Sequence, residues 1–158
     1  MKDIFIDADI ANRFAKPPDE SYRNLIKWLL KNDKGKPELN AILMLSDKLI
    51  GEYKGGNVGC CNVNSIAAIL NTVLIELRYV KLKNDDLKHF IKTHITKKII
   101  KDVITCNKKD WWHFPLVFYS DRKMAIVFDN KFRNDLLNFP KFSKGVSVFE
   151  NPEEKIYL

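Results

Sequence analysis

The sequence predicts an α/β fold built on an open, mainly parallel sheet with helices on both faces. Short apolar runs of strand length alternate with longer stretches in which apolar residues recur at helical spacing. This alternation is typical of parallel strands joined by helical crossovers. No internal repeat and no long linker divides the chain. Because 158 residues suit one domain, we expect a single domain over residues 1–158, arranged in three layers.

The N-terminal part supplies a strand, a helix and a second strand. Residues 4–6 form a short apolar run that ends at Asp7, as in a buried strand. Apolar residues at helical spacing then run from Asp19 to a stop signal at Gly35. Ala41–Leu45 is apolar throughout, which favours a strand covered on both faces. Strand, helix and strand in this order predict a right-handed parallel crossover.

Helices are expected through the middle of the chain. The first begins at Ser46 or Asp47 and stops at Gly55-Gly56, and a second spans residues 65–79. Apolar residues between positions 87 and 103 keep a helical spacing, which indicates one or two further helices with a lysine-rich outer face.

The C-terminal part is expected to complete the sheet. Residues 111–119 suggest a helix despite Pro115. Residues 125–128 form a buried strand that ends at Asp129, and residues 146–149 suit a last strand.

A local excess of basic residues accounts for the net charge. The chain has 27 Lys and Arg against 20 Asp and Glu, a net charge of +7. Residues 78–109 hold ten Lys and Arg against three Asp, so this segment alone carries the same excess. Such a surface favours an anionic partner, with nucleic acid ahead of a membrane surface or an acidic protein. Trp111, Trp112 and Phe114 are candidates for stacking a base, with core packing as the alternative.

The cysteines and apolar stretches bear on the compartment. Cys60, Cys61 and Cys106 form no C-x-x-C pair, which fits a reducing environment. No signal peptide is readable at the N-terminus. The most apolar later stretch, residues 66–77, is too short and too interrupted to span a membrane. We therefore expect a soluble, cytoplasmic protein with no membrane partner.

Four acids are predicted to meet at one edge of the sheet. Asp7 and Asp129 each follow a strand, and ligands of such sheets bind outside the carboxyl ends of the strands. Glu52 lies in the helix after the second strand, and Asp110 stands just before another helix. Carboxylates this close repel one another unless a cation neutralises them. Oxygen ligands suit Mg²⁺ or Mn²⁺, which can activate water for phosphodiester hydrolysis.

The stretches around these acids resemble, in order, the four acidic motifs of PIN-domain nucleases. They are Phe5-Ile6-Asp7-Ala8-Asp9, Leu45-Ser46-Asp47-Lys48-Leu49-Ile50-Gly51-Glu52-Tyr53, Lys109-Asp110-Trp111-Trp112-His113 and Ile126-Val127-Phe128-Asp129-Asn130-Lys131-Phe132. Together the motifs span most of the chain.

The resemblance implies a PIN-like, three-layer fold and a Mg²⁺- or Mn²⁺-dependent endoribonuclease. Such enzymes are commonly the toxin half of a bacterial or archaeal toxin-antitoxin pair. RNA, an antitoxin protein and a second copy of the chain are therefore the implied partners. The implied metal-binding and catalytic acids are Asp7, Glu52, Asp110 and Asp129. Asp9 and His113 are the implied secondary site residues.

Two departures from the family pattern bear on activity. Many members have Thr or Ser two residues before the last acid, where Val127 stands here. The long basic insertion between Glu52 and Asp110 also obscures the middle strand of the family, which we place at residues 103–106.

A phosphatase of the haloacid dehalogenase type is the main alternative. Asp7-Ala8-Asp9 after the first strand resembles its D-x-D motif, with Asp7 as the nucleophile. Asp129 and Asp135 would then be the metal acids. Ala11 stands where that family usually has Thr or Val, and the remaining two acids are left unexplained.

A catalytically inert scaffold is the other alternative. In this reading a PIN-like module binds RNA or a protein partner through its basic segment, and Val127 reflects lost turnover. A single acid is most often solvated surface, and His113 then has a structural role in the core.

Overall fold

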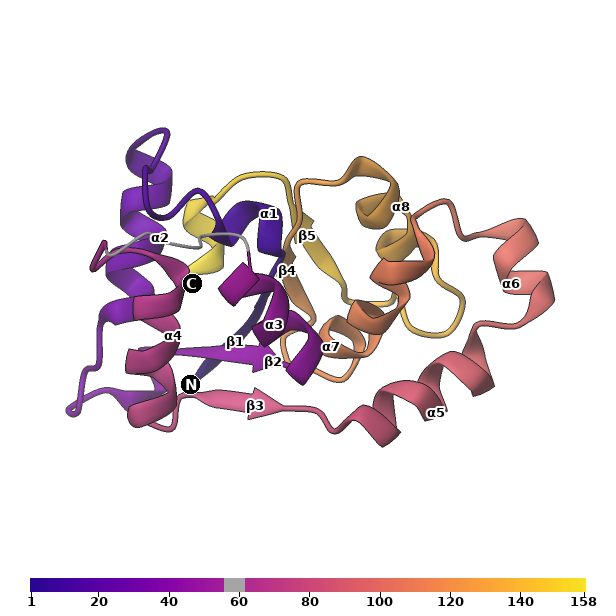
Figure 1. The fold of residues 1–158 in the computed structure, drawn as a ribbon, viewed down its shortest axis with the longest axis horizontal. Helices are drawn as coiled ribbons and strands as arrows, with labels where there is room; N and C mark the ends of the chain where they lie inside the picture. Colours follow the sequence, from indigo (N-terminus) through magenta and orange to yellow (C-terminus); the bar gives the residue numbers. More distant parts are fainter. Residues whose placement is uncertain (56–61) are drawn as a thin grey trace.

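The computed structural model describes residues 1–55 and 62–158, and its central element is a parallel sheet. Every strand pair in these residues is parallel, in the order β3-β2-β1-β4-β5 (Figure 1). The predicted open, parallel sheet is confirmed. The strands are β1 (Lys2–Ile6), β2 (Ala41–Leu45), β3 (Tyr79–Lys81), β4 (Met124–Ile126) and β5 (Ser147–Phe149).

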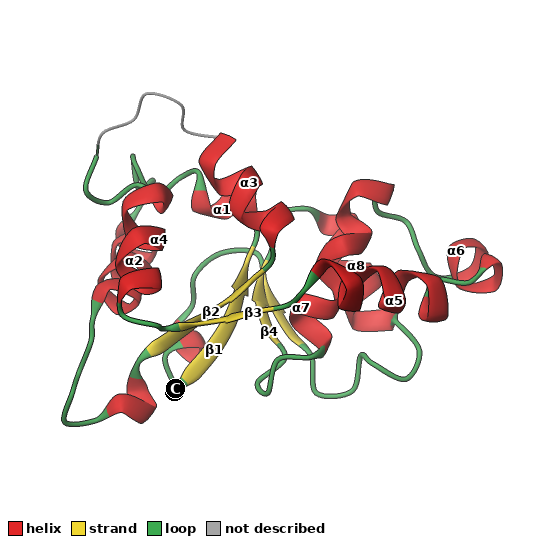
Figure 2. Cartoon of the chain, turned by 60° about the horizontal axis from the view of Figure 1, so that its bottom comes forward, coloured by secondary structure: helices red, strands yellow, loops and turns green. Residues whose placement is uncertain are grey.

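Helices cover both faces of this sheet and make the predicted three layers. The α-helices are α1 (Ala8–Ala11), α2 (Glu20–Leu30), α3 (Asp47–Gly55), α4 (Ile66–Ile75), α5 (Asn84–His94), α6 (Lys97–Asp102), α7 (Phe114–Phe118) and α8 (Asn130–Asn138). Helices α2 and α4 pack on one side of the sheet, and α7 and α8 pack on the other (Figure 2). None of the helices in the described residues is both long and apolar enough to cross a membrane.

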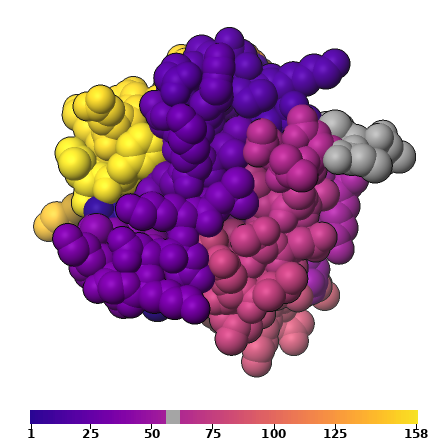
Figure 3. All heavy atoms as spheres, turned by 90° about the vertical axis from the view of Figure 1, so that its left-hand side faces the viewer, coloured from indigo at the N-terminus to yellow at the C-terminus, as the bar shows by residue number. Residues whose placement is uncertain are grey.

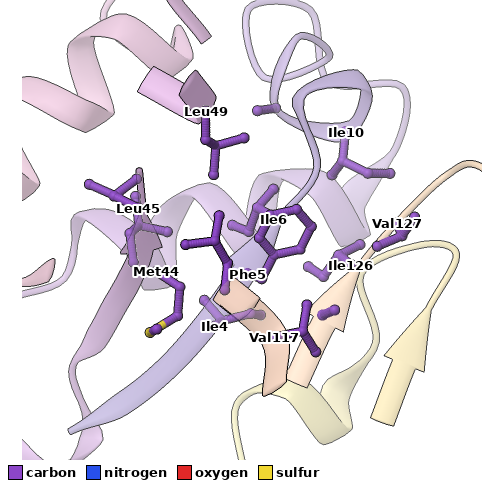
Figure 4. Packing of buried hydrophobic residues seen from close by; sticks show 14 of the residues in the cluster. Ile4, Phe5, Ile6, Ile10, Met44, Leu45, Leu49, Val117, Ile126 and Val127 are labelled. Atoms are coloured by element: carbon purple, nitrogen blue, oxygen red, sulfur yellow. The ribbon is translucent and has the colours of Figure 1, made fainter. Parts of the chain in front are cut away.

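The first strand lies at the centre of the core. Ile4, Phe5 and Ile6 are fully buried, and the side chains of α3, α7 and β4 surround them (Figure 4). Successive side chains of a strand point to opposite faces, so a strand covered on both faces must be apolar throughout. This is why a continuous apolar run predicts β1 and β2 correctly.

The order of the strands changes direction beside the end of β1, which makes this a topological switch point of the sheet. The chain runs from β1 to β2 and β3 on one side and then returns to β4 on the other. The amide of Asp7 donates to the carbonyl of Ile126 at 2.9 Å, which joins the ends of β1 and β4. Ligands of open α/β sheets bind at such a point.

The third strand of the sheet was not predicted, and it begins at the last residue of a predicted helix. Helix α4 ends at Ile75 rather than at residue 79, and Tyr79–Lys81 forms the edge strand β3. Leu77, with φ of 55°, turns the chain between them. Apolar residues continue at helical spacing to Leu77, so the pattern contains no sign of this end.

The prediction of a strand at residues 103–106 is wrong. The amides of Thr105 and Cys106 each donate to Oδ2 of Asp135 at 2.8 Å, and the hydroxyl of Thr105 donates to Oδ1. A buried carboxylate of α8 therefore takes the hydrogen bonds that a neighbouring strand would otherwise make.

The other predicted elements agree in type, with shifted ends, but helix α1 was not predicted. The expected helix at 111–119 is a 3-10 segment, Lys108–His113, followed by α7 with Pro115 in its first turn. Strand β4 stops at Ile126, short of the predicted residue 128. Two further 3-10 turns lie at Pro37–Leu39 and Glu154–Ile156.

The two ends of the described chain lie together. The ammonium group of Lys2 donates to the carbonyls of Tyr157 and Leu158, both at 2.6 Å. The rings of Trp28 and Tyr157 lie 5.3 Å apart, and Figure 3 shows the yellow C-terminal residues beside the indigo residues of the N-terminal part. Of the three cysteines, Cys106 is free, and Cys60 and Cys61 lie outside the described residues.

Candidate functional site

A pocket of about 430 Å³ opens at the carboxyl end of the sheet. All four acids predicted from the sequence lie in its wall, each carried by a different part of the chain. Asp9, Asn12 and Lys109 contribute further polar groups. The full lining is Asp7, Ala8, Asp9, Asn12, Glu52, Gly55, Asn107, Lys109, Asp110, Asp129 and Phe132.

Asp7 directly follows β1, and its carboxylate makes no capping hydrogen bond to helix α1. Its backbone carbonyl accepts from the amides of Ile10 and Ala11, so it begins α1 without using its side chain. Burial, followed by the negative charge of Asp9, raises the pKa of Asp7 to about 6. The carboxyl therefore lies in a place that disfavours its charged form.

Asp129 follows β4 and begins α8. Its Oδ1 accepts the amide of Phe132 at 2.9 Å, an N-cap contact that fixes the carboxylate at the wall of the pocket. The guanidinium of Arg133 donates to the carbonyls of Val127 and Phe128 and so holds the same turn. Val127 has no hydroxyl to support this turn, and Arg133 holds the turn through its contacts with the backbone carbonyls.

Glu52 reaches the pocket from α3 and is supported from behind. Nε2 of His113 lies 3.0 Å from Oε2 of Glu52, and the imidazole is 2% exposed. Burial works to raise the pKa of Glu52, but the hydrogen bond and charge of His113, with Lys48 and Lys109, outweigh it and lower the pKa. These contacts therefore favour the charged form of Glu52.

Asp110 projects from the 3-10 segment Lys108–His113. Its amide donates to the carbonyl of Asn107 at 2.9 Å, which tightens the turn that carries it. Burial raises the pKa of Asp110, and the charge of Asp129 adds to that effect against the lowering by Lys109 and His113. Two of the four acids thus have a raised pKa in the absence of a cation.

The two secondary residues differ in position. Asp9 lines the pocket beside Asp7. His113 is not in the lining but contacts Phe5 and Phe132 with its ring, at centroid distances of 5.6 and 6.4 Å. Its Nδ1 is buried without a hydrogen-bond partner among the described residues. His113 therefore acts on the pocket through Glu52.

The carboxylate oxygens of the pocket are chemically suited to bind a hard divalent cation. Carboxylate oxygens are the ligands that Mg²⁺ and Mn²⁺ prefer, and burial of Asp7 and Asp110 leaves negative charge that a cation would relieve. In residues 1–55 and 62–158, no three Asp, Glu, His or Cys side chains are grouped closely enough to hold a metal as they stand. The carboxylates would have to turn toward a common point.

Sequence reasoning missed three groups at this site. Asn107 and Asn12 line the pocket, and the ammonium group of Lys48 donates to the carbonyl of Lys109 at 2.8 Å. The position of Asn107, three residues before Asp110, was the signal that could have identified it as a site residue. Lys48 contacts a residue 61 positions away, so no local sequence pattern indicates this contact.

Asp135, a metal acid in the phosphatase reading, lies elsewhere. It is 1% exposed, and both of its oxygens accept hydrogen bonds from Thr105 and Cys106. It does not line the acidic pocket. Its role is to hold the segment that precedes Asp110.

Comparison with known proteins gives a likeness in fold. Neither a protein-family model nor a curated protein matches the sequence. The fold is similar to that of a chain in the crystal structure of VapBC2 from Rickettsia felis bound to a DNA fragment from its promoter. The match has a TM-score of 0.53 and 13% identity, and it covers 92% of this chain and 96% of the other. The predicted PIN-like fold is confirmed.

Proposed function

We propose that this protein is a metal-dependent ribonuclease that hydrolyses phosphodiester bonds of RNA in the acidic pocket. The observation that carries the proposal is the meeting of Asp7, Glu52, Asp110 and Asp129 at the switch point of the sheet. They come from separate elements, and three of them have no ion pair in the described part of the chain. Uncompensated acids in a pocket cost stability, which favours a functional reason for them.

Each group has a part in this chemistry. When bound, Mg²⁺ or Mn²⁺ would supply Lewis-acid stabilisation and an activated water for phosphodiester hydrolysis. Asp7, Glu52, Asp110 and Asp129 are the residues that would hold it. Glu52, oriented by His113, stays charged at the same wall. Lys109 places a positive charge at the rim, where it attracts a phosphate.

The proposed biological setting is a toxin-antitoxin pair. The solved structure with a similar fold is VapBC2 bound to promoter DNA. We infer that this chain is the toxin half, with an antitoxin protein and a second copy of itself as partners. The positive charge of residues 78–109 supports a nucleic-acid substrate.

The test is cleavage of labelled single-stranded RNA in Mn²⁺ or Mg²⁺, with EDTA as the metal-free control. Asp7→Asn should lose cleavage, because it removes one carboxylate of the pocket. Asp86→Asn, which removes an exposed acid of α5, is the charge-matched control and should cut at the normal rate. Cleavage that persists in EDTA, or at full rate in Asp7→Asn, would contradict the proposal.

The phosphatase alternative has one observation in its favour. Asp7 and Asp9 line the same pocket, as a D-x-D nucleophile pair requires. A phosphatase should form a stable complex with beryllium fluoride at Asp7, whereas a nuclease needs no covalent intermediate. An inert scaffold should bind RNA and give neither result.

A further inference from the structure

A second pocket, of about 490 Å³, lies beside the acidic one. Its lining comes from three elements: α3, the first turns of α5, and the 3-10 segment Lys108–His113. The residues are Asp47, Lys48, Asn84, Lys88 and Trp112. It therefore combines an aromatic ring with two ammonium groups and a side-chain amide.

Trp112 is the aromatic residue of its segment that faces outward. Phe114 is fully buried, and Trp111 packs against the hydrophobic core. Trp112 instead lines the second pocket and is partly exposed. An aromatic ring at an open pocket offers a stacking surface to any base, because every base has a π-face.

Lys48 connects the second pocket to the acids. Its Nζ lies 5.4 Å from the centre of the Trp112 ring and donates to the carbonyl of Lys109. Lys109 lines the acidic pocket. Lys48 and Glu52 are four residues apart on α3, so they lie on one helix face with their Cβ atoms about 6 Å apart. A ligand chain that leaves one pocket can thus enter the other.

The charge of the second pocket is positive despite Asp47. The Oδ1 of Asp47 pairs with Lys81, and its Oδ2 lies 3.5 Å from the amide of Asn84. The charge of that carboxylate is therefore compensated by Lys81, which is not in the pocket lining. Lys48 and Lys88 remain to attract an anion.

We propose that this second pocket is a nucleotide subsite for single-stranded RNA. Trp112 stacks one base there, and Lys48 and Lys88 bind the adjoining phosphates. The inference rests on the proposed function, since it places a neighbouring nucleotide of the same RNA whose backbone reaches the acids. An acidic peptide would use the two ammonium groups but would have no need of the ring face.

The test measures affinity in EDTA, so that no cleavage occurs. A short, fluorescently labelled single-stranded RNA is titrated with the full-length protein, with Trp112→Ala and with Trp112→Phe. Removing a stacking ring should weaken binding roughly tenfold or more. Trp112→Phe, which keeps an aromatic face, should recover most of that loss. Thermal unfolding of each variant checks that the fold is kept.

Lysine variants give an independent readout. Lys88→Ala should weaken binding and reduce the slope of log affinity against log salt by about 0.7. Lys92→Ala, an exposed residue of the same helix outside the pocket, is the matched control and should change affinity less.

A polyanion without bases separates stacking from charge. Inorganic polyphosphate should bind Trp112→Ala as well as it binds the wild type, but should lose affinity to Lys88→Ala. Equal RNA affinity in wild type and Trp112→Ala would overturn the subsite. So would polyglutamate binding that depends on Trp112 as strongly as RNA binding does.

Failure of the subsite and failure of the nuclease reading give different results. If RNA is cut but its affinity does not depend on Trp112, the subsite is wrong and the nuclease stands. If affinity depends on Trp112 but no metal yields cleavage, the subsite stands and the nuclease reading is wrong.

Discussion

His113 shows how one buried residue can set the state of the site. Its imidazole packs against the rings of Phe5 and Phe132 and holds Glu52 through a hydrogen bond of 3.0 Å. The contact lowers the pKa of Glu52 against the opposing effect of burial. His113 is thus a positioning residue, because it touches the acid and does not line the pocket.

We expect His113→Phe to keep the ring packing and to lose the contact with Glu52. A hydrogen bond to a charged group contributes about 1.5–3 kcal/mol, so kcat for RNA cleavage should fall roughly tenfold to a hundredfold. KM should not change, because the ring does not face the substrate. Steady-state kinetics measures both. His113→Gln, which keeps a donor, should recover part of kcat; an equal loss in both variants would make the role purely structural.

Much of the site could be predicted at this scale, and the reason is local. Asp7 and Asp129 follow apolar strands, and the parallel sheet brings the ends of those strands together. The support of Glu52 by His113 was not predictable, because the two residues are 61 positions apart. His113 was identified only as a secondary residue, and no sequence pattern shows which acid it touches.

Asp7 should make the stability of the metal-free protein depend on pH. Below pH 3.8 its carboxyl is protonated in both the folded and the unfolded chain. As pH rises, the unfolded chain loses this proton first, and the folded chain loses it only near pH 6. The contribution of Asp7 to the free energy of unfolding therefore falls by about 2–3 kcal/mol as pH rises from 3.8 to about 6.

Asp7→Asn removes that dependence. We expect the variant to be more stable than the wild type at pH 7 in EDTA by about 2–3 kcal/mol, and equal to it near pH 3.8. Urea unfolding across this pH range measures the difference. Asp86→Asn serves as the exposed control. If the stability difference between Asp7→Asn and the wild type grew as pH fell, its sign would be opposite to that expected from the burial of Asp7.

At the scale of elements, the apolar runs were informative and the connections were not. Ala41–Leu45 has the bounds that the sequence predicts, because a strand buried on both faces must be apolar throughout. The edge strand Tyr79–Lys81 has exposed positions and only three residues, so it carries no such signal. Its place depends on the turn at Leu77 and on Arg78, which the apolar pattern does not reveal.

Arg78 should anchor this turn. Its guanidinium is 3% exposed and donates to the carbonyls of Leu29 and Ala41, and it pairs with Glu76. We expect Arg78→Ala to destabilise the fold by about 3 kcal/mol, since it leaves two buried carbonyls without a donor. Chemical denaturation measures this.

The control for Arg78 is an arginine with an exposed ion pair. Arg23 pairs with Glu20 at 3.5 Å on the surface of α2. Arg23→Ala should cost less than about 1 kcal/mol. Comparable losses in the two variants would mean that the buried contacts of Arg78 add nothing.

At the scale of the whole molecule, acidic and basic surfaces meet at one end of the sheet. The acids line the pocket at the switch point, and helices α5 and α6 extend away from the sheet (Figure 1), with three Lys against one Asp on α6. Of the ten basic residues in 78–109, five lie on these two helices together with all three Asp, so most of the excess charge of the segment lies outside them. The lysines of α6 offer an RNA backbone positive charge at a distance from the acids.

The salt dependence of RNA binding tests whether α6 belongs to the RNA path. Lys97, Lys98 and Lys101 are exposed on α6 and line neither of the two pockets. If they bind phosphates, replacing all three by alanine should reduce the slope of log affinity against log salt by about 2, at about 0.7 per contact with a single strand. The value of kcat at saturating RNA should not change, because the acids are untouched. An unchanged slope would confine the RNA to the two pockets and make the charge of α6 available to a different anionic partner.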